Sequence, residues 1–191
     1  MALLRDAAQL ISGTPQFRIT EDWGDAAPRY VIYSQMDLED DSRGLITQRA
    51  GGKQVKTWDV VVTASTGDVI FSLLSGTAVI AQAEHHGYLL TQNYIKLIPV
   101  GEIDAFYLVY LLNENRLIRR QLRVGQQGSS TMKYTLRQLR ELELPQLPSL
   151  KRQELIGRAY ACQLKLDALR KRMSERETIL VREMMRRADR Q

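Results

Sequence analysis

The stretch VGQQGSSTMKYTLRQLRELELPQLPSLKRQELIG, residues 124–157, decides the fold that the sequence predicts. A loop rich in glycine, serine and glutamine leads into a short apolar segment, two prolines and the start of a long charged helix. Proline fixes its own backbone angle and has no N–H to donate, so Pro145 and Pro148 should end the preceding segment and set the direction of the helix. We therefore expect one domain over residues 1–148 and a separate helix over residues 149–191.

The helical segment has the pattern of a coiled coil. Residues 149–190 contain no proline, and their single glycine, Gly157, lies near the start. A helix of about 40 residues spans roughly 60 Å, so part of it should protrude from a domain of this size and pair with another helix. Small and apolar residues recur at alternating steps of four and three, as in a seam between helices. They are Leu155, Ala159, Cys162, Leu166, Leu169 and Met173.

This seam predicts a dimer held by the C-terminal helices, either a homodimer or a heterodimer with another chain of the same kind. Antiparallel pairing is favoured because it keeps the basic ends of the two helices apart, and like charges repel. The alternative is a helix that packs back along its own domain and needs no second chain.

Residues 1–148 alternate between strand and helix patterns, so the predicted fold class is α+β, a mixed α/β domain followed by a long coiled-coil helix. Apolar residues at three- to four-residue spacing predict one helix over residues 102–122, with Asp104 as its N-cap. The acidic segment 37–44 is interpreted as a loop. Strands are predicted where β-branched runs lie between turn residues, at 29–35, 57–63, 68–74, 77–83 and 88–99.

Positive charge is concentrated towards the C-terminal part of the chain. The net charge is +5, although residues 1–115 carry an acidic excess. Unopposed cations beside a Gly/Ser/Gln loop are typical of a surface that binds a polyanion such as nucleic acid. The alternative is a solvated basic face. Between residues 116 and 140 there are seven basic residues and no acidic ones, namely Arg116, Arg119, Arg120, Arg123, Lys133, Arg137 and Arg140.

Sequence motifs for catalysis and metal binding are absent. The chain has no glycine-rich phosphate loop, dinucleotide-binding fingerprint or nucleophile elbow. His85 and His86 are adjacent, so their side chains should point apart, and Cys162 is interpreted as a small core residue. We therefore expect a protein that is not an enzyme and that holds no metal or cofactor.

The expected compartment follows from three features of the sequence. A single cysteine excludes an internal disulfide and suggests a reducing environment. The first residues, MALLRDAAQL, lack the basic and apolar regions of a signal peptide, and no stretch approaches the roughly 20 apolar residues of a membrane span. We expect a soluble, cytoplasmic protein.

The stretch 124–157, called the hinge from here on, resembles the junction between a target-recognition domain and a spacer helix in specificity subunits of type I restriction–modification systems. Four upstream segments also resemble that family in the expected order: LRDAAQLISGTP, GDVIFSLLSG, LTQNYIKLIP and DAFYLVYLLNEN. Arg152 departs from the pattern, because the family usually has an acidic residue there. The hinge residues that match are Gly128, Ser129, Leu136, Leu139, Leu142, Leu144, Pro145, Leu147, Pro148, Leu150, Gln153 and Ile156.

The resemblance implies a half-subunit, with one recognition domain and one spacer helix where a full specificity subunit has two of each. It implies sequence-specific binding of double-stranded DNA. It also implies an adenine N6-methyltransferase partner, which would hold S-adenosylmethionine, and in full complexes a translocating nuclease partner. Neither catalytic activity nor a cofactor is expected on this chain.

Candidate DNA-binding residues are those that can hold phosphates or read base edges. The first group follows the predicted central helix and comprises Arg119, Arg120, Arg123, Gln126, Gln127, Ser129, Ser130 and Lys133. The second group comprises Arg43, Gln48, Arg49, Lys53 and Lys56. The competing hypothesis is a coiled-coil adaptor that binds only protein and whose basic surface has no ligand.

Overall fold

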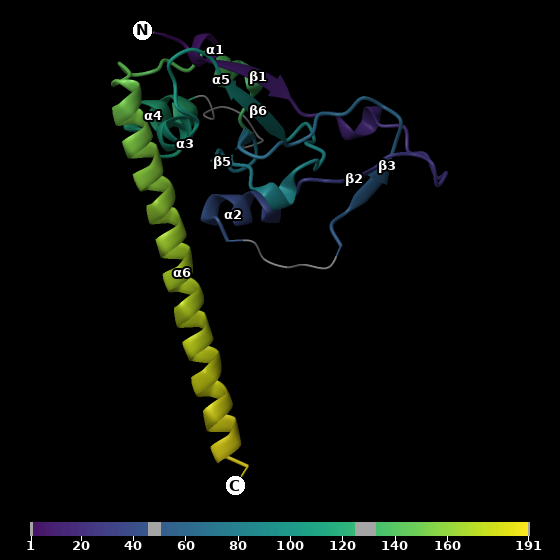
Figure 1. The fold of residues 1–191 in the computed structure, drawn as a ribbon, viewed down its shortest axis with the longest axis vertical. Helices are drawn as coiled ribbons and strands as arrows, with labels where there is room; N and C mark the ends of the chain where they lie inside the picture. Colours follow the sequence, from purple (N-terminus) through teal and green to yellow (C-terminus); the bar gives the residue numbers. More distant parts are fainter. Residues whose placement is uncertain (1, 46–50, 125–132, 191) are drawn as a thin grey trace.

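A computed structural model describes residues 2–45, 51–124 and 133–190 (Figure 1). The predicted α+β class and the long C-terminal helix are confirmed. The helices are α1 (Leu4–Ala7), α2 (Gln35–Arg43), α3 (Ala105–Glu114), α4 (Arg116–Val124), α5 (Leu136–Arg140) and α6 (Leu150–Ala188), with 3-10 turns η1 (Gln16–Arg18) and η2 (Ala83–His85). The strands are β1 (Ala8–Ser12), β2 (Arg29–Val31), β3 (Gln54–Lys56), β4 (Val69–Ser72), β5 (Ala78–Ile80) and β6 (Tyr94–Pro99).

Four of these strands form an antiparallel sheet in the order β1-β6-β4-β5. Side chains alternate between the two faces of a strand, and in β4 both faces are buried. Val69 and Phe71 enter the cluster that contains the helices, whereas Ile70 enters a second cluster with Tyr33 and Leu38. Because both faces are covered, β4 is a continuous apolar run and not an alternating one.

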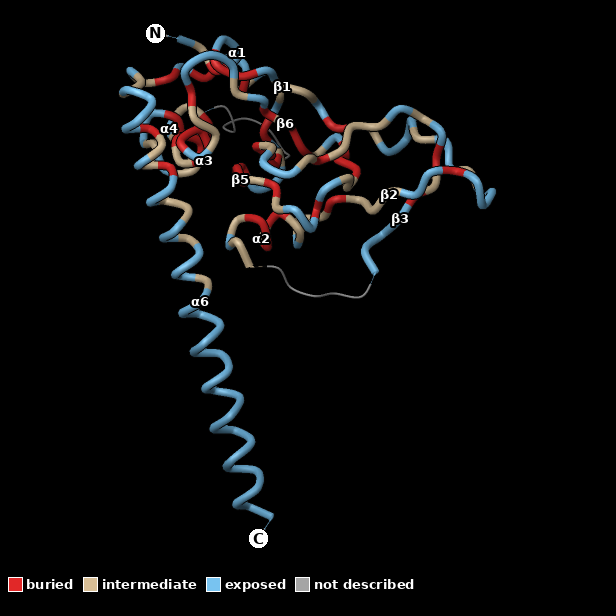
Figure 2. The backbone as a smooth tube through the Cα atoms, in the orientation of Figure 1, coloured by how far each residue is buried: buried red, intermediate tan, exposed pale blue. Residues whose placement is uncertain are grey.

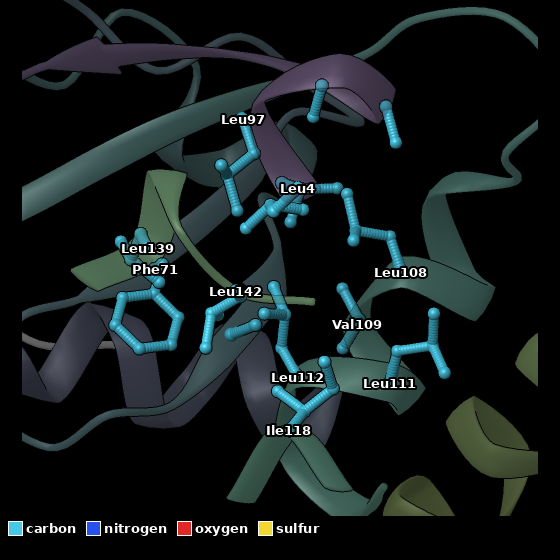
Figure 3. Packing of buried hydrophobic residues seen from close by; sticks show 14 of the residues in the cluster. Leu4, Phe71, Leu97, Leu108, Val109, Leu111, Leu112, Ile118, Leu139 and Leu142 are labelled. Atoms are coloured by element: carbon cyan, nitrogen blue, oxygen red, sulfur yellow. The ribbon is translucent and has the colours of Figure 1, made fainter. Parts of the chain in front are cut away.

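The main core packs residues from the start and the end of the domain against helix α3. Figure 3 shows Leu4, Leu142 and Leu112 meeting in this core, although they come from α1, the hinge and α3. The backbone N–H of Leu4 donates to the carbonyl of Leu142 at 2.8 Å, and that of Leu144 donates to Ala2 at 2.9 Å. The apolar part of the hinge is therefore held beside the start of the chain, and the departure point of α6 is fixed.

The helix predicted over 102–122 is two helices, so that prediction is partly wrong. Asp104 caps α3 as expected, accepting a hydrogen bond from the N–H of Tyr107 at 2.9 Å. The chain turns at Asn115, whose side-chain oxygen accepts bonds from the N–H groups of Leu117 and Ile118 and so caps α4. An asparagine that can satisfy two free N–H groups starts a new helix more readily than it continues an old one.

The acidic segment interpreted as a loop is helix α2, so that interpretation is wrong. Ser34 and Asp37 form a reciprocal capping box at its start, with the Ser34 N–H donating to Asp37 at 2.7 Å. The predicted strand over 57–63 is also wrong. The pairing of β3 ends at Lys56, and residues 57–63 contribute one isolated bridge, between Thr63 and Leu89.

A buried hydrogen-bond network holds α2 against η2. The hydroxyl of Tyr33 donates to Asp41 at 2.6 Å, and Nδ1 of His85 lies 2.7 Å from the other oxygen of that carboxylate. Nε2 of His85 lies 3.5 Å from Asp37. Burial opposes protonation of the His85 ring and is the largest single influence, but the hydrogen bond to Asp41 and the charges of Asp41 and Asp37 together raise its pKa.

Helix α6 runs unbroken for 39 residues, and its first turns pack on α3. The buried side chain of Gln153 anchors it: the amide nitrogen donates to the carbonyls of Glu102 and Pro148, both at 2.9 Å, and the amide oxygen accepts from the N–H of Asp104 at 3.1 Å. These bonds join α6 to the hinge and to the start of α3. No described helix is long and apolar enough to cross a membrane.

Gly157 allows α6 to approach α3 closely. A Cβ atom at this position would lie 2.5 Å from the backbone nitrogen of Tyr107 and 2.7 Å from the Cβ of Phe106. Such distances are too short for any other residue, so the glycine sets the spacing between the two helices. Beyond this contact α6 also passes α2, and residues 169–190 are all exposed (Figure 2).

Candidate nucleic-acid interface

Helix α4 carries four arginines and no acidic residue. Ile118 and Leu122 are buried against α3 and the core, which turns the arginines of the same helix outward. These arginines line a shallow depression of about 500 Å³ together with Asn113, Glu114 and Val124. They are Arg116, Arg119, Arg120 and Arg123. Such a row of guanidinium groups can meet the phosphates of a nucleic acid backbone.

The four arginines do not have equal freedom. Arg119 is half-buried, and its Nη1 donates to the carbonyl oxygen of Gly76 at 2.7 Å, which ties α4 to the turn between β4 and β5. Arg120 and Arg123 are exposed, and among the described residues neither has an ion-pair partner. The structure thus assigns Arg119 a positioning contact and leaves the charges of Arg120 and Arg123 open to a ligand.

The second predicted group lies elsewhere and is partly engaged within the chain. Arg43 pairs with Glu39 at 3.2 Å, near the end of α2. Lys56 pairs with Asp25 at 3.2 Å, and its Nζ also donates to the carbonyl of Gly24. Lys53 is exposed. Figure 1 places β3 at the far end of the domain from α4 and α6, so the two groups do not form one compact patch.

Several candidates fall outside the described ranges. Lys133 is described and exposed, directly before the buried Tyr134. Residues 125–132, which lie between α4 and Lys133, are outside the described ranges. The candidates beyond the described residues are Gln48, Arg49, Gln126, Gln127, Ser129 and Ser130.

Helix α6 has two apolar faces, and the domain covers only one of them. Gln153 and Gly157 are buried, and half-buried residues at helical spacing continue the same face through Ile156, Tyr160, Ala161 and Leu164. At about 100° per residue, the predicted seam lies on the opposite side of the helix. The seam's four large side chains, Leu155, Leu166, Leu169 and Met173, are 42–70% exposed.

The two small residues of the seam are exposed as well. Ala159 and Cys162 both face solvent, so Cys162 is not a core residue of the domain, contrary to its interpretation from sequence. The sequence pattern identified this face correctly as apolar, but it did not reveal the second face, because Gln153, Gly157 and Ala161 are not strongly apolar.

At the level of sequence, metal binding was the only role weighed for His85 and His86. Across the described ranges, no group of three His, Cys, Asp or Glu side chains could hold a metal ion. His85 instead joins Asp41 in the buried network described above. The missed signal was local: Asp37 and Asp41 lie one turn apart on α2 and so present two carboxylates to one side of that helix.

Neither a protein-family model nor a curated protein sequence matches this chain. Solved structures do. The HsdS subunit from Thermoanaerobacter tengcongensis is 18% identical, with a TM-score of 0.59, over 91% of this chain and 39% of that chain. A chain from a structure on complex assembly and conformational transition of the type I R-M system is 19% identical, with a TM-score of 0.60, over 96% of this chain and 42% of that chain.

A third structure, the type I restriction-modification S subunit from M. genitalium, is 13% identical, with a TM-score of 0.50, over 96% of this chain and 43% of that chain. This chain has the fold of a type I specificity subunit. It spans about two fifths of the length of the solved structures.

The specificity-subunit fold gives the hinge motif a physical meaning. Leu142 and Leu144 are buried core residues, and the buried Gln153 holds the first turn of α6 to α3. Pro148 supplies one of the carbonyls that Gln153 binds. Leu142, Leu144, Pro148 and Gln153, four of the residues that carry the sequence resemblance, therefore help to orient the helix relative to the domain.

Proposed function

We propose that this chain is a DNA-recognition subunit of a type I restriction–modification system, in the form of a half-subunit. Its domain binds double-stranded DNA and directs a partner adenine methyltransferase, and where present a nuclease, to the target. The chain performs no catalytic step, and S-adenosylmethionine is bound by the partner. Its DNA target also fits a cytoplasmic location.

The observation that carries this proposal is the combination of the specificity-subunit fold with the arginine-lined depression on α4. The fold match covers 91–96% of the chain, so it includes part of α6 as well as the domain. A likeness of fold does not by itself give a ligand, so the charge on α4 supplies the second argument. Arg120 and Arg123 are exposed cations without an ion-pair partner among the described residues, and a phosphate backbone requires such cations.

Measuring DNA binding at several salt concentrations tests the proposal. Replacing Arg120 and Arg123 by alanine should weaken binding to a duplex and lower the slope of log affinity against log salt by about two, because each lost phosphate contact removes roughly one counterion. The matched control removes Arg182 and Arg186 from the far end of α6, which leaves the domain unchanged. Arg119 is excluded from the variant because it also holds the Gly76 turn.

Two outcomes contradict the proposal. A wild-type chain with no salt-dependent DNA binding favours the coiled-coil adaptor instead. Equal slopes for wild type and the α4 variant would move the DNA surface away from α4, with Lys53 as the next candidate to replace.

For assembly, we propose an antiparallel pair of α6 helices joined along the seam. The seam residues alternate between the two apolar heptad positions, a and d. In an antiparallel coiled coil, an a residue faces a d residue of the partner helix. In the register that we propose, Leu166 lies against the partner's Leu169 and Met173 against the partner's Cys162. Leu155 faces the partner's Leu180, so the pairing continues into the protruding half. Burying a large apolar side chain contributes about 1.5–3 kcal/mol before entropy is subtracted.

Cross-linking through the single cysteine distinguishes the two orientations. In the antiparallel pair the two Cys162 residues are offset by eleven residues, roughly 16 Å at 1.5 Å per residue, too far for a disulfide. A Met173→Cys variant should therefore form covalent dimers under mild oxidation, whereas wild type should not. Lys171→Cys, on the face that points towards the domain, is the control and should remain monomeric. Covalent dimers of wild type would show parallel pairing instead.

A further inference from the structure

Two exposed tryptophans mark the end of the domain farthest from α6. We call this region, residues 16–31 and 51–60, the distal lobe, and it contains β2 and β3 (Figure 1). Trp23 and Trp58 are the only tryptophans in the chain, and they are 86% and 65% exposed. Large aromatic side chains are seldom left so open, because burying one stabilises a protein by several kcal/mol. The proposed DNA surface on α4 does not use them.

The loop that carries Trp23 is held to the segment that carries Trp58. The indole N–H of Trp58 donates to Asp22 at 3.0 Å, and the N–H of Asp22 donates to the carbonyl of Lys56 at 2.9 Å. The N–H of Thr20 donates to Asp59 at 2.7 Å. These bonds hold the Trp58 ring and the backbone beside Trp23 before any ligand arrives, which reduces the ordering needed on binding.

A cleft of about 540 Å³ lies between these segments, and its chemistry is aromatic and acidic. Trp23 and Trp58 contribute rings, and Glu21, Asp22 and Asp59 contribute carboxylates. Among the described residues no lysine or arginine lines this cleft, whereas Arg29 and Lys56 line the adjoining depression. Asp22 and Asp59 already accept hydrogen bonds within the lobe. Glu21 is exposed and, among the described residues, has no ion pair.

We infer that this cleft binds an arginine or lysine side chain presented by a protein partner. The faces of indole rings attract cations, and tryptophan does so more strongly than tyrosine or phenylalanine. The carboxylates add charge complementarity and can accept the N–H groups of a guanidinium. The same carboxylates repel phosphate, so the cleft suits a basic protein segment and not a nucleic acid backbone. The distal lobe is thus a protein-docking surface separate from α4, and this inference does not rest on the proposed function.

Tryptophan fluorescence reports on this cleft alone, because both tryptophans of the chain lie in it. The probe is a short peptide with one arginine between glycines, compared with the same peptide carrying citrulline, a neutral isostere. The full chain should show a saturable change with the arginine peptide that weakens as salt rises. The citrulline peptide should bind at least several-fold more weakly.

Variants locate the effect. Trp23→Ala should weaken binding of the arginine peptide about two- to fivefold, the size of one exposed cation–π contact, while Trp58 still reports. Glu21→Gln should reduce the salt dependence. Val60→Ala is the matched control, since Val60 is fully exposed and does not line the cleft. Urea unfolding confirms that each variant is folded.

Three results would overturn the inference. Equal responses to the arginine and citrulline peptides would remove the role of charge. No saturable response to either peptide would show that the cleft has no such ligand. A saturable response to duplex DNA that Trp23→Ala abolishes would make the lobe a nucleic-acid surface, a result that leaves the proposed DNA recognition standing.

Discussion

The two halves of α6 have the same secondary structure but opposite surroundings. Residues 150–168 pack on α3 and α2, whereas every residue from 169 to 188 is exposed and the end of the helix extends beyond the domain. Both halves are rich in charged residues and good helix formers. The difference shows that local sequence makes the helix, whereas tertiary contacts, among them those of Gln153 and Gly157, decide where the domain holds it.

An exposed helix of this length is poorly stable alone, because most helical stability in proteins comes from packing. The protruding half carries Ile179, Leu180, Val181, Met184 and Met185, all at least 49% exposed. The docked half is stabilised from within the chain, so the protruding half should depend on a second chain. The following changes test that contrast, from the largest expected effect to the smallest.

Leu166→Glu combined with Leu169→Glu should abolish dimerisation and most DNA affinity, while the melting of the domain stays unchanged. Placing acids at the centre of the seam puts unpaired charges in an apolar interface. Sedimentation at tens of micromolar measures the assembly state. Gln163→Glu with Arg170→Glu adds two acids beside the seam and should still dimerise. A wild-type chain that sediments as a monomer would contradict the expected contrast between the two halves.

Gly157→Val should lower the free energy of unfolding by about 1–3 kcal/mol or more, because its side chain would overlap the backbone of Tyr107 and the Cβ of Phe106. Ala159→Val inserts the same side chain on the exposed face and should cost less than about 1 kcal/mol. Urea unfolding of dilute protein gives both values. Equal losses for the two variants would mean that the close approach to α3 is unimportant.

Gln153→Ala should cost about 1–3 kcal/mol, since it leaves the N–H of Asp104 and the carbonyl of Glu102 without their partner in a buried site. Gln163→Ala, on the exposed side of α6, should change stability by less than about 0.5 kcal/mol. The hydrogen-exchange rate of the first turn of α6 should rise in the first variant only. Unchanged protection there would show that Pro148 and the hinge orient the helix without Gln153.

The domain, unlike the protruding helix, should respond to pH through His85. Its pKa is raised in the folded state, so protonated His85 contributes stability that is complete below the unfolded value near 6.5 and is lost as pH rises through the higher folded value. The stability difference between wild type and His85→Gln should therefore shrink with rising pH. Chemical unfolding from pH 5 to pH 9 measures it, and a constant difference would contradict the prediction.

Much of the architecture could be predicted from local patterns. The β-branched runs located β4, β5 and β6, Asp104 was a correct cap, and the loss of proline and glycine beyond Pro148 gave the continuous α6. Helix α2 was not predicted, because its acidic composition suggested a loop and the Ser34–Asp37 capping signal was given no weight. The position of the arginines on one helix was also predictable, but the tie between Arg119 and Gly76 was not.

The sequence alone determined the long C-terminal helix, which face of α6 is an apolar seam and where the positive charge lies, because these depend on neighbours within a few turns. The tertiary structure decided the rest. It turned Gly157 into a contact point, buried Gln153 and His85 with their partners, and brought Trp23 and Trp58 to one cleft across 35 residues of sequence. Such contacts join segments far apart in the chain, and the order of residues along the chain does not reveal which distant segments lie close together in space.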